Sequence, residues 1–219
     1  MKVGYTLKKD LKQEIIDAAL QLFQTHGYNG VTISQIVAHV GASKGGFYHH
    51  FKAKDELLYE IHDVFITYVL EEAKRTEEMY ATPIAKLCAL LQSFTAAFHK
   101  YQAHITVFYD ESKSLLDSDR EVIKQKRDAY RKILQHVIIE GQQSGDFRTE
   151  LPPTIVTMSI TGMVNWSYKW YKQDGTMTMA QITAIFIDMI LRSIITQQGA
   201  QEASEYVIQS ANNEAGFIF

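Results

Sequence analysis

Four polar side chains within one short segment belong to residue types that bind nucleic acids. Lys44, Tyr48 and either His49 or His50 have the spacing of one face of a helix. Ammonium, phenol and imidazole groups can each hydrogen-bond a phosphate oxygen or the edge of a base. The Lys44 ammonium can reach guanine O6 or N7 in a major groove. The segment therefore predicts contact with double-stranded DNA.

Two short helices joined by a turn are expected to position these side chains. Thr32 and Gln35 have the spacing of a capping box, and Gly41 ends the helix that they open. Ser43 can cap a second helix, which carries Lys44. Such a pair forms a helix-turn-helix when the first helix buries its apolar side. The same pattern also fits an ordinary helix pair whose polar side is only hydrated.

The charge distribution favours a polyanion as the partner of the N-terminal segment. The chain of 219 residues has a formal net charge of −3. Residues 1–54 contain seven lysines and three acidic residues, a balance of +4. The remaining 165 residues contain 15 basic and 22 acidic residues, a balance of −7. A basic segment on an acidic body is typical of proteins that meet nucleic acid.

The rest of the chain is expected to be helical, so the predicted fold class is all-α. The three prolines, Pro83, Pro152 and Pro153, stand where helices can begin. Phe94, Phe98 and Tyr101 are expected on one face of the helix that follows Pro83. Further helices are expected over residues 8–26, 53–79, 153–171 and 178–194, with a long helix from Asp117 or Ser118 to near Gly145.

The single cysteine, Cys88, excludes an intramolecular disulfide and a cysteine-cluster metal site. No apolar segment reaches the roughly 18 residues that a membrane span needs. The first residues contain no apolar stretch of the kind found in a secretory signal. We therefore expect a cytoplasmic protein with no membrane partner and no metal.

An enzyme and a structural helical adaptor are the alternative classes. His136 and Glu140 are spaced i, i+4, but no H-E-x-x-H motif, glycine-rich phosphate loop or nucleophile elbow occurs. Other candidate groups lie close together in sequence: His99, His104, Tyr109, Asp110 and Glu111. We expect no catalysis and no cofactor. Salt-sensitive retention on duplex DNA would separate a regulator from both alternatives.

Residues 11–58 resemble the DNA-binding domain of the tetracycline-repressor (TetR) family. The resemblance rests on VTISQIVAHVGASKGGFYHHFKAKDELL at residues 31–58 and on the ALQLF and GY of the preceding helix. It implies an N-terminal three-helix DNA-binding domain (1–54), a ligand-binding and dimerisation domain (55–199) and a tail (200–219). It also implies a homodimer on a palindromic operator.

The resemblance places Thr32, Tyr48, His50 and Lys54 on phosphates, although Thr32 could act as a cap only. Gly46 departs from the family, which has a small Thr or Ala there. Phe47 and Phe51 are expected in the core. Ser34, Lys44, Gly45 and Gly46 are expected to face the bases. The full set of residues expected to contact DNA is Thr32, Ser34, Ser43, Lys44, Gly45, Gly46, Tyr48, His49, His50 and Lys54.

The run GMVNWSYKWY at residues 162–171 resembles the acyl-CoA-sensing, fatty-acid-degradation (FadR-type) repressors of this family. It implies a fatty acyl-CoA effector, whereas an apolar wall alone would suit a multidrug or xenobiotic sensor. Arg127 and Arg131 could clamp a phosphate or pair with Asp128 or Glu121. The expected effector-binding residues are Phe94, Phe98, Phe108, Tyr109, Arg127, Tyr130, Arg131, Met163, Trp166 and Trp170.

The helices expected over residues 153–171 and 178–194 are the most apolar of the chain, which makes them the expected dimer interface. Ser159, Thr161 and Gly162 would allow close approach of a second copy. An aromatic stripe such as Met163, Trp166 and Trp170 fits a core or a dimer interface as well as it fits a ligand site.

Overall fold

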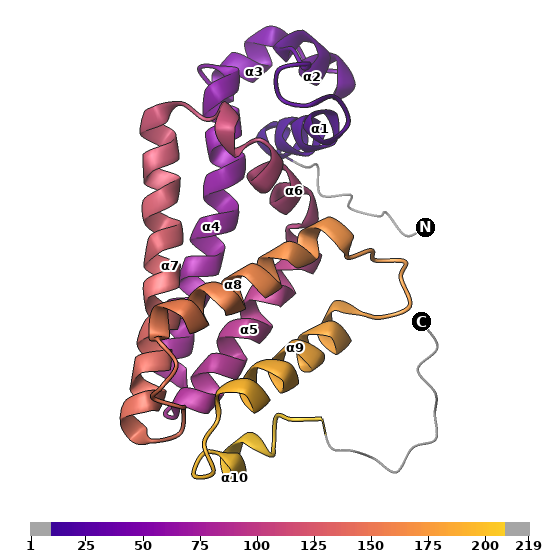
Figure 1. The fold of residues 1–219 in the computed structure, drawn as a ribbon. Helices are drawn as coiled ribbons and strands as arrows, with labels where there is room; N and C mark the ends of the chain where they lie inside the picture. The colour runs from indigo at the N-terminus through magenta and orange to yellow at the C-terminus, as the bar shows by residue number, and fades with distance from the viewer. Residues whose placement is uncertain (1–9, 209–219) are drawn as a thin grey trace, which may run out of the picture. The chain divides into compact units, whose positions relative to one another are not determined.

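A computed structural model describes residues 10–208, and helices form its regular structure (Figure 1). Within this range no strand occurs, and one isolated antiparallel bridge joins Phe147 to Ile195. The predicted all-α class is confirmed. No helix in the described part is long and apolar enough to cross a membrane. Residues 8 and 9 of the first expected helix, and 209–219 of the expected tail, lie outside the described residues.

The described chain divides into two compact units. The head unit comprises residues 10–68 and 101–126, and the body unit comprises residues 69–100 and 127–208. Helices α4 (Lys54–Met79) and α7 (Asp117–Ser144) each contribute residues to both units. The functional domain ranges 1–54 and 55–199 stay a prediction.

The head unit begins with three helices whose starts are fixed by local side-chain caps. They are α1 (Leu11–His26), α2 (Ile33–His39) and α3 (Lys44–His50). Thr32 and Gln35 form the predicted capping box at α2, and the Ser43 hydroxyl accepts the Gly46 N–H at 3.1 Å at α3. These caps bond N–H groups that lack a partner within the helix.

Aromatic side chains form the core beneath α3. Phe47 and Phe51 are buried with their rings 5.5 Å apart, as predicted. Helices α1, α2 and α3 contact one another, and α1 also contacts α6 (Gln102–Asp110). The short 3-10 helix η1 (Ser112–Ser114) follows α6. Burial of these rings fixes which side of α3 stays accessible.

Tyr101 does not lie on the same helix as Phe94 and Phe98, so that expectation is wrong. Helix α5 (Pro83–Lys100) ends at the residue before Tyr101. Tyr101 directly precedes α6, with φ −122° and ψ 26°. Its ring contacts those of Tyr68 at 5.0 Å and His104 at 5.3 Å within the head unit. These tertiary contacts accompany a helix break that no proline or glycine marks in the sequence.

The body unit contains α5, parts of α4 and α7, and α8 (Pro153–Trp170), α9 (Met179–Ile194) and α10 (Ala200–Ala203). Pro83 and Pro153 are the first residues of their helices, and Thr178 and Gln181 form a second capping box. Helices α5 and α9 lie side by side (Figure 1). The hydroxyls of Thr95 and Thr183 meet between them at 2.8 Å.

Candidate DNA-binding and effector sites

The exposed side of α3 carries the polar residues that the sequence predicted there. Lys44 and His49 are exposed, and Tyr48 is 54% exposed with its ring perpendicular to that of Phe47, 5.5 Å between their centres. His50 is half-buried, and its ring lies 4.9 Å from that of His49. An ammonium and a phenol therefore stand accessible on one short helix, directly after the Ser43 cap. Their contact with DNA stays a prediction.

The side chain of Thr32 is already engaged as a cap. Its hydroxyl oxygen accepts the Gln35 N–H at 3.3 Å, and Gln35 Oε1 accepts the Thr32 N–H at 2.8 Å. Thr32 and Ser34 are both exposed at the start of α2. A phosphate bound by Thr32 would share the hydroxyl with this capping box.

The two glycines at the start of α3 differ in their surroundings. A Cβ added at Gly45 would meet only Ser43 Oγ, at 3.6 Å. A Cβ added at Gly46 would lie 3.2 Å from Leu11 Cδ2, so position 46 points towards α1. The expectation that Gly46 faces the bases stays a prediction.

Lys54, expected on a phosphate, instead makes its described bonds inside the head unit. Its Nζ donates to the main-chain oxygens of Tyr28 at 2.8 Å and Val31 at 2.7 Å. Burial lowers the pKa of Lys54, while Asp55 and Glu111 act in the opposite direction. An ammonium has three N–H donors, so these bonds leave one hydrogen for a phosphate.

Two carboxylates that support the same turn were not expected from the sequence. Glu111 Oε1 accepts the Tyr28 N–H at 2.9 Å, and the Tyr28 hydroxyl donates to Asp55. Burial and the hydrogen bond to Asp55 raise the pKa of Tyr28. Glu111 lies 83 residues from Tyr28, so no local pattern connects them.

The structure brings together some of the aromatic residues expected to bind an effector. In the body unit the ring of Phe94 lies 5.9 Å from Phe98 and 5.5 Å from Tyr130. Arg131 pairs with Asp128 at 2.9 Å, which is one of the two alternatives left open for it. Arg127 is exposed.

Several of the other expected effector residues lie on other helices, and their described ring contacts are with other partners. Phe108 and Tyr109 belong to the head unit, where Phe108 is buried against Phe65 at 5.0 Å. Trp166 is 62% exposed on α8, and Trp170 is also exposed, with its ring perpendicular to that of Phe186. Met163 is half-buried.

A half-open cavity of about 880 Å³ lies in the body unit along α5 and α9. Buried Thr95 and Thr183 are among its lining residues, together with the aromatic rings of Tyr171 and Tyr206. Glu205 is the acidic residue of the lining, and no lysine, arginine or histidine belongs to it. None of the expected effector residues lines this cavity. Thr95 and Thr183 are 88 residues apart, which explains why the sequence did not indicate it.

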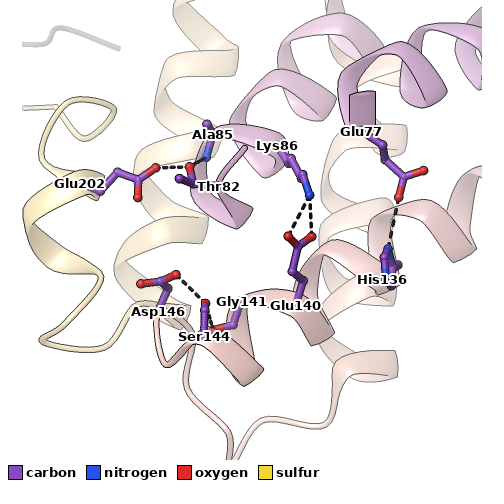
Figure 2. A network of polar contacts seen from close by, with 10 residues as sticks. All are labelled: Glu77, Thr82, Ala85, Lys86, His136, Glu140, Gly141, Ser144, Asp146 and Glu202. Carbon is purple, nitrogen blue, oxygen red and sulfur yellow. Dashed lines mark hydrogen bonds and ion pairs between the residues drawn. The ribbon is translucent and has the colours of Figure 1, made fainter. Parts of the chain in front are cut away.

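His136 and Glu140, the pair considered for catalysis, bind different partners (Figure 2). His136 Nδ1 lies 3.3 Å from Glu77 Oε1, whereas both carboxylate oxygens of Glu140 accept from Lys86 Nζ at 2.8 Å. The side chain of His99 lies outside the described residues. Among the described residues, no group of three or more His, Cys, Asp or Glu could hold a metal ion. The pair therefore forms two separate polar contacts.

Two family models together match most of the chain. The model of bacterial regulatory proteins of the tetR family matches residues 15–61, which include α2 and α3. The model of the tetracyclin repressor-like C-terminal domain matches residues 80–194, more than half of the chain.

Individual relatives share both sequence and fold with the chain. The transcriptional repressor KstR2 of Mycolicibacterium smegmatis is 26% identical, covering 88% of this chain and 94% of its own. The structure of the ketosteroid regulator KstR2 of Mycobacterium tuberculosis has a TM-score of 0.81 at 23% identity, covering 87% and 97%.

A third relative was solved with ligands. The structure of AibR in complex with isovaleryl coenzyme A and operator DNA has a TM-score of 0.73 at 26% identity, covering 82% of this chain and 97% of its own. Members of the tetR family are DNA-binding regulators, which sets aside the enzyme alternative. The exposed polar side of α3, the capped α2–α3 pair and the two matched models lead to one conclusion: this chain belongs to the TetR family of transcriptional regulators.

Proposed function

We propose that this chain is a dimeric transcription repressor that binds a near-palindromic operator and is released by a bulky hydrophobic effector, a fatty acyl-CoA. The exposed side of α3 carries the proposal, because Lys44 and Tyr48 stand outside a core that contains Phe47 and Phe51. Lysine can read guanine in the major groove, and tyrosine can hold a phosphate. A relative named as a transcriptional repressor, KstR2, supports repression as the outcome of binding.

Exposed apolar residues on α8 and α9 support a second copy as the partner. Ile155, Met158 and Trp166 are exposed on α8, and Met189 is 55% exposed on α9. Contiguous large apolar residues on a surface mark interaction sites. A Cβ added at Gly162 would meet nothing within 4 Å, so α8 leaves room for close approach there. Two copies would double the base contacts that one seven-residue helix can make.

The acyl-CoA effector is supported by two features of the body unit. Phe94, Phe98 and Tyr130 supply a cluster of apolar rings suited to an acyl chain. The exposed guanidinium of Arg127 could meet the phosphates of coenzyme A. The likeness to AibR, which was solved with isovaleryl coenzyme A, points to the same ligand class.

The α5–α9 cavity favours a second candidate, a sensor of uncharged hydrophobic compounds such as xenobiotics. Its volume of about 880 Å³ falls in the range of about 300–1,000 Å³ that holds drug-sized ligands. Its lining contains no lysine, arginine or histidine, so a phosphate bound there would gain no cationic partner from it. An uncharged molecule needs only the apolar wall and the hydroxyls.

Release from DNA separates the two candidates. A duplex is first selected by the full-length protein from a random pool, and its retention must fall as salt rises. Isovaleryl-CoA, palmitoyl-CoA and an uncharged steroid are then titrated in turn into the protein–duplex complex. Separately, native mass spectrometry of protein purified without a refolding step identifies any molecule that co-purifies. We expect an acyl-CoA to co-purify and to release the duplex. Release by the steroid with no effect of either thioester would replace the acyl-CoA proposal with the second candidate.

A further inference from the structure

The turn between α1 and α2 is held by a residue from a distant part of the chain. Glu111, at the end of α6, accepts the Tyr28 N–H through Oε1 at 2.9 Å and the Ser114 hydroxyl through Oε2 at 3.0 Å. Gly27 has φ +69°, and a Cβ added there would lie 3.3 Å from the same Oε1. The carboxylate therefore lies directly against the backbone of this turn.

The same turn residue is bound at both of its main-chain groups. The Glu111 carboxylate accepts a hydrogen bond from the Tyr28 N–H, and Lys54 Nζ, at the start of α4, donates one to the Tyr28 C=O at 2.8 Å. Lys54 also binds the main-chain oxygen of Val31, directly before the Thr32 cap of α2. A buried side chain at each end, Tyr28 and Val31, fixes the turn against the core. The start of α2 therefore depends on contacts from α4 and α6.

We infer that Glu111 is a positioning residue for DNA binding, acting through the Tyr28 amide. It lies outside residues 15–61, which match the DNA-binding model, yet it fixes the turn that leads into the helix pair. Loss of this acceptor would leave the N–H of a buried residue to find another partner, and the turn would move to supply one. The inference rests on the proposed operator binding by α3.

If Glu111 acted only through its charge, its replacement by a neutral residue would have the opposite effect on DNA binding. A carboxylate near a bound polyanion repels it, so removing the charge of Glu111 would strengthen binding. Positioning predicts that losing the hydrogen bond weakens binding, whatever the charge. Glutamine keeps the carbonyl acceptor and removes the charge, whereas aspartate keeps the charge and is too short to make the same contact.

The test compares Glu111→Gln, Glu111→Asp and Glu111→Ala with the wild type on the duplex selected from a random pool. We expect the Asp and Ala variants to bind about tenfold more weakly, as loss of one charge-assisted hydrogen bond implies, and the Gln variant to stay within about threefold. Hydrogen exchange at the Tyr28 amide should accelerate in the Asp and Ala variants only. Glu78→Ala, which removes an exposed acid of α4, should change neither quantity.

Unchanged or tighter binding by the Asp variant would overturn the inference. If Glu111→Ala does not fold, the comparison of the Gln and Asp variants still decides, because each keeps one property of the carboxylate. If the wild type selects no duplex, the proposed operator binding fails instead. In that case exchange at the Tyr28 amide still reports on the bond itself, so the two failures remain distinguishable.

Discussion

The Nζ atom of Lys54 lies 4.0 Å from the centre of the Tyr28 ring and donates a 2.8 Å hydrogen bond to the main-chain oxygen of the same residue. A cation over an aromatic face and a charge-assisted hydrogen bond both stabilise the contact. The α1–α2 turn and the first residue of α4 are thereby joined. Lys54 supports the DNA-binding helices whether or not it also reaches a phosphate.

Replacing this lysine should weaken the fold of the head unit. We expect Lys54→Met to lower the free energy of unfolding by about 1–3 kcal/mol, because two main-chain oxygens lose a charged donor. Urea denaturation followed by circular dichroism measures this change. Lys52→Met, which alters an exposed lysine two residues earlier, should leave the stability within about 0.5 kcal/mol. Equal effects of the two substitutions would contradict the assignment.

Two residues on α3 should affect DNA binding differently. We expect Tyr48→Ala to weaken binding to every duplex, because phosphate contacts carry no sequence information. Lys44→Ala should mainly relax sequence preference, by about 1–3 kcal/mol at the base it reads. Competition between the selected duplex and random DNA measures both, with Lys132→Ala on α7 as the charge control. Equal loss on both duplexes for Lys44→Ala would contradict a base contact.

A charge on the exposed side of α9 should prevent dimer formation. We expect Met189→Glu to convert a dimer into a monomer of 25.0 kDa, since a second copy would have to bury the carboxylate. Light scattering at micromolar concentration measures the mass. Met79→Glu introduces the same charge at a methionine that is also exposed, near the end of α4, and should leave the dimer intact. A wild-type monomer under these conditions would rule out the proposed dimer.

Effector binding should depend on Arg127 if the ligand is an acyl-CoA. We expect Arg127→Ala to weaken isovaleryl-CoA binding about tenfold through loss of a charge-assisted contact, measured by calorimetry. Ala184→Trp, which places a large ring in the α5–α9 cavity, should leave thioester binding unchanged. The reverse pattern, with a steroid excluded by Ala184→Trp and no dependence on Arg127, would support the uncharged effector.

The buried thiol of Cys88 should make the protein less stable at alkaline pH. Burial, assisted by Glu202, raises the pKa of Cys88 from 9.0 to about 12. Above pH 9 the unfolded chain loses this proton while the folded chain keeps it, so stability is fully present below pH 9 and falls as pH rises towards 12. Urea denaturation at pH 8, 9 and 10 measures the slope, and Cys88→Ala should reduce it. Native Cys88 should also resist iodoacetamide at pH 8, because the thiolate is the reactive form.

Local pattern in the sequence determined the caps, the helical class and the DNA-binding helix pair. Thr32 with Gln35, and Thr178 with Gln181, lie within one turn of helix, so each contact follows from spacing alone. The helical periodicity that buries Phe47 and leaves Tyr48 exposed is equally local. The resemblance of residues 11–58 to the TetR family is confirmed by the matched models.

The tertiary structure decided where these side chains found partners from distant parts of the chain. Glu111 meets Tyr28 across 83 residues, and Thr183 meets Thr95 across 88, separations that no periodicity encodes. Sequence spacing placed Trp166 and Trp170 on one face of α8, but only packing showed that this face is exposed. The sequence alone identified the polar and aromatic side chains that could bind DNA or an effector. Their partners depend on which buried surfaces the helices share, because packing and not spacing sets the distances between helices.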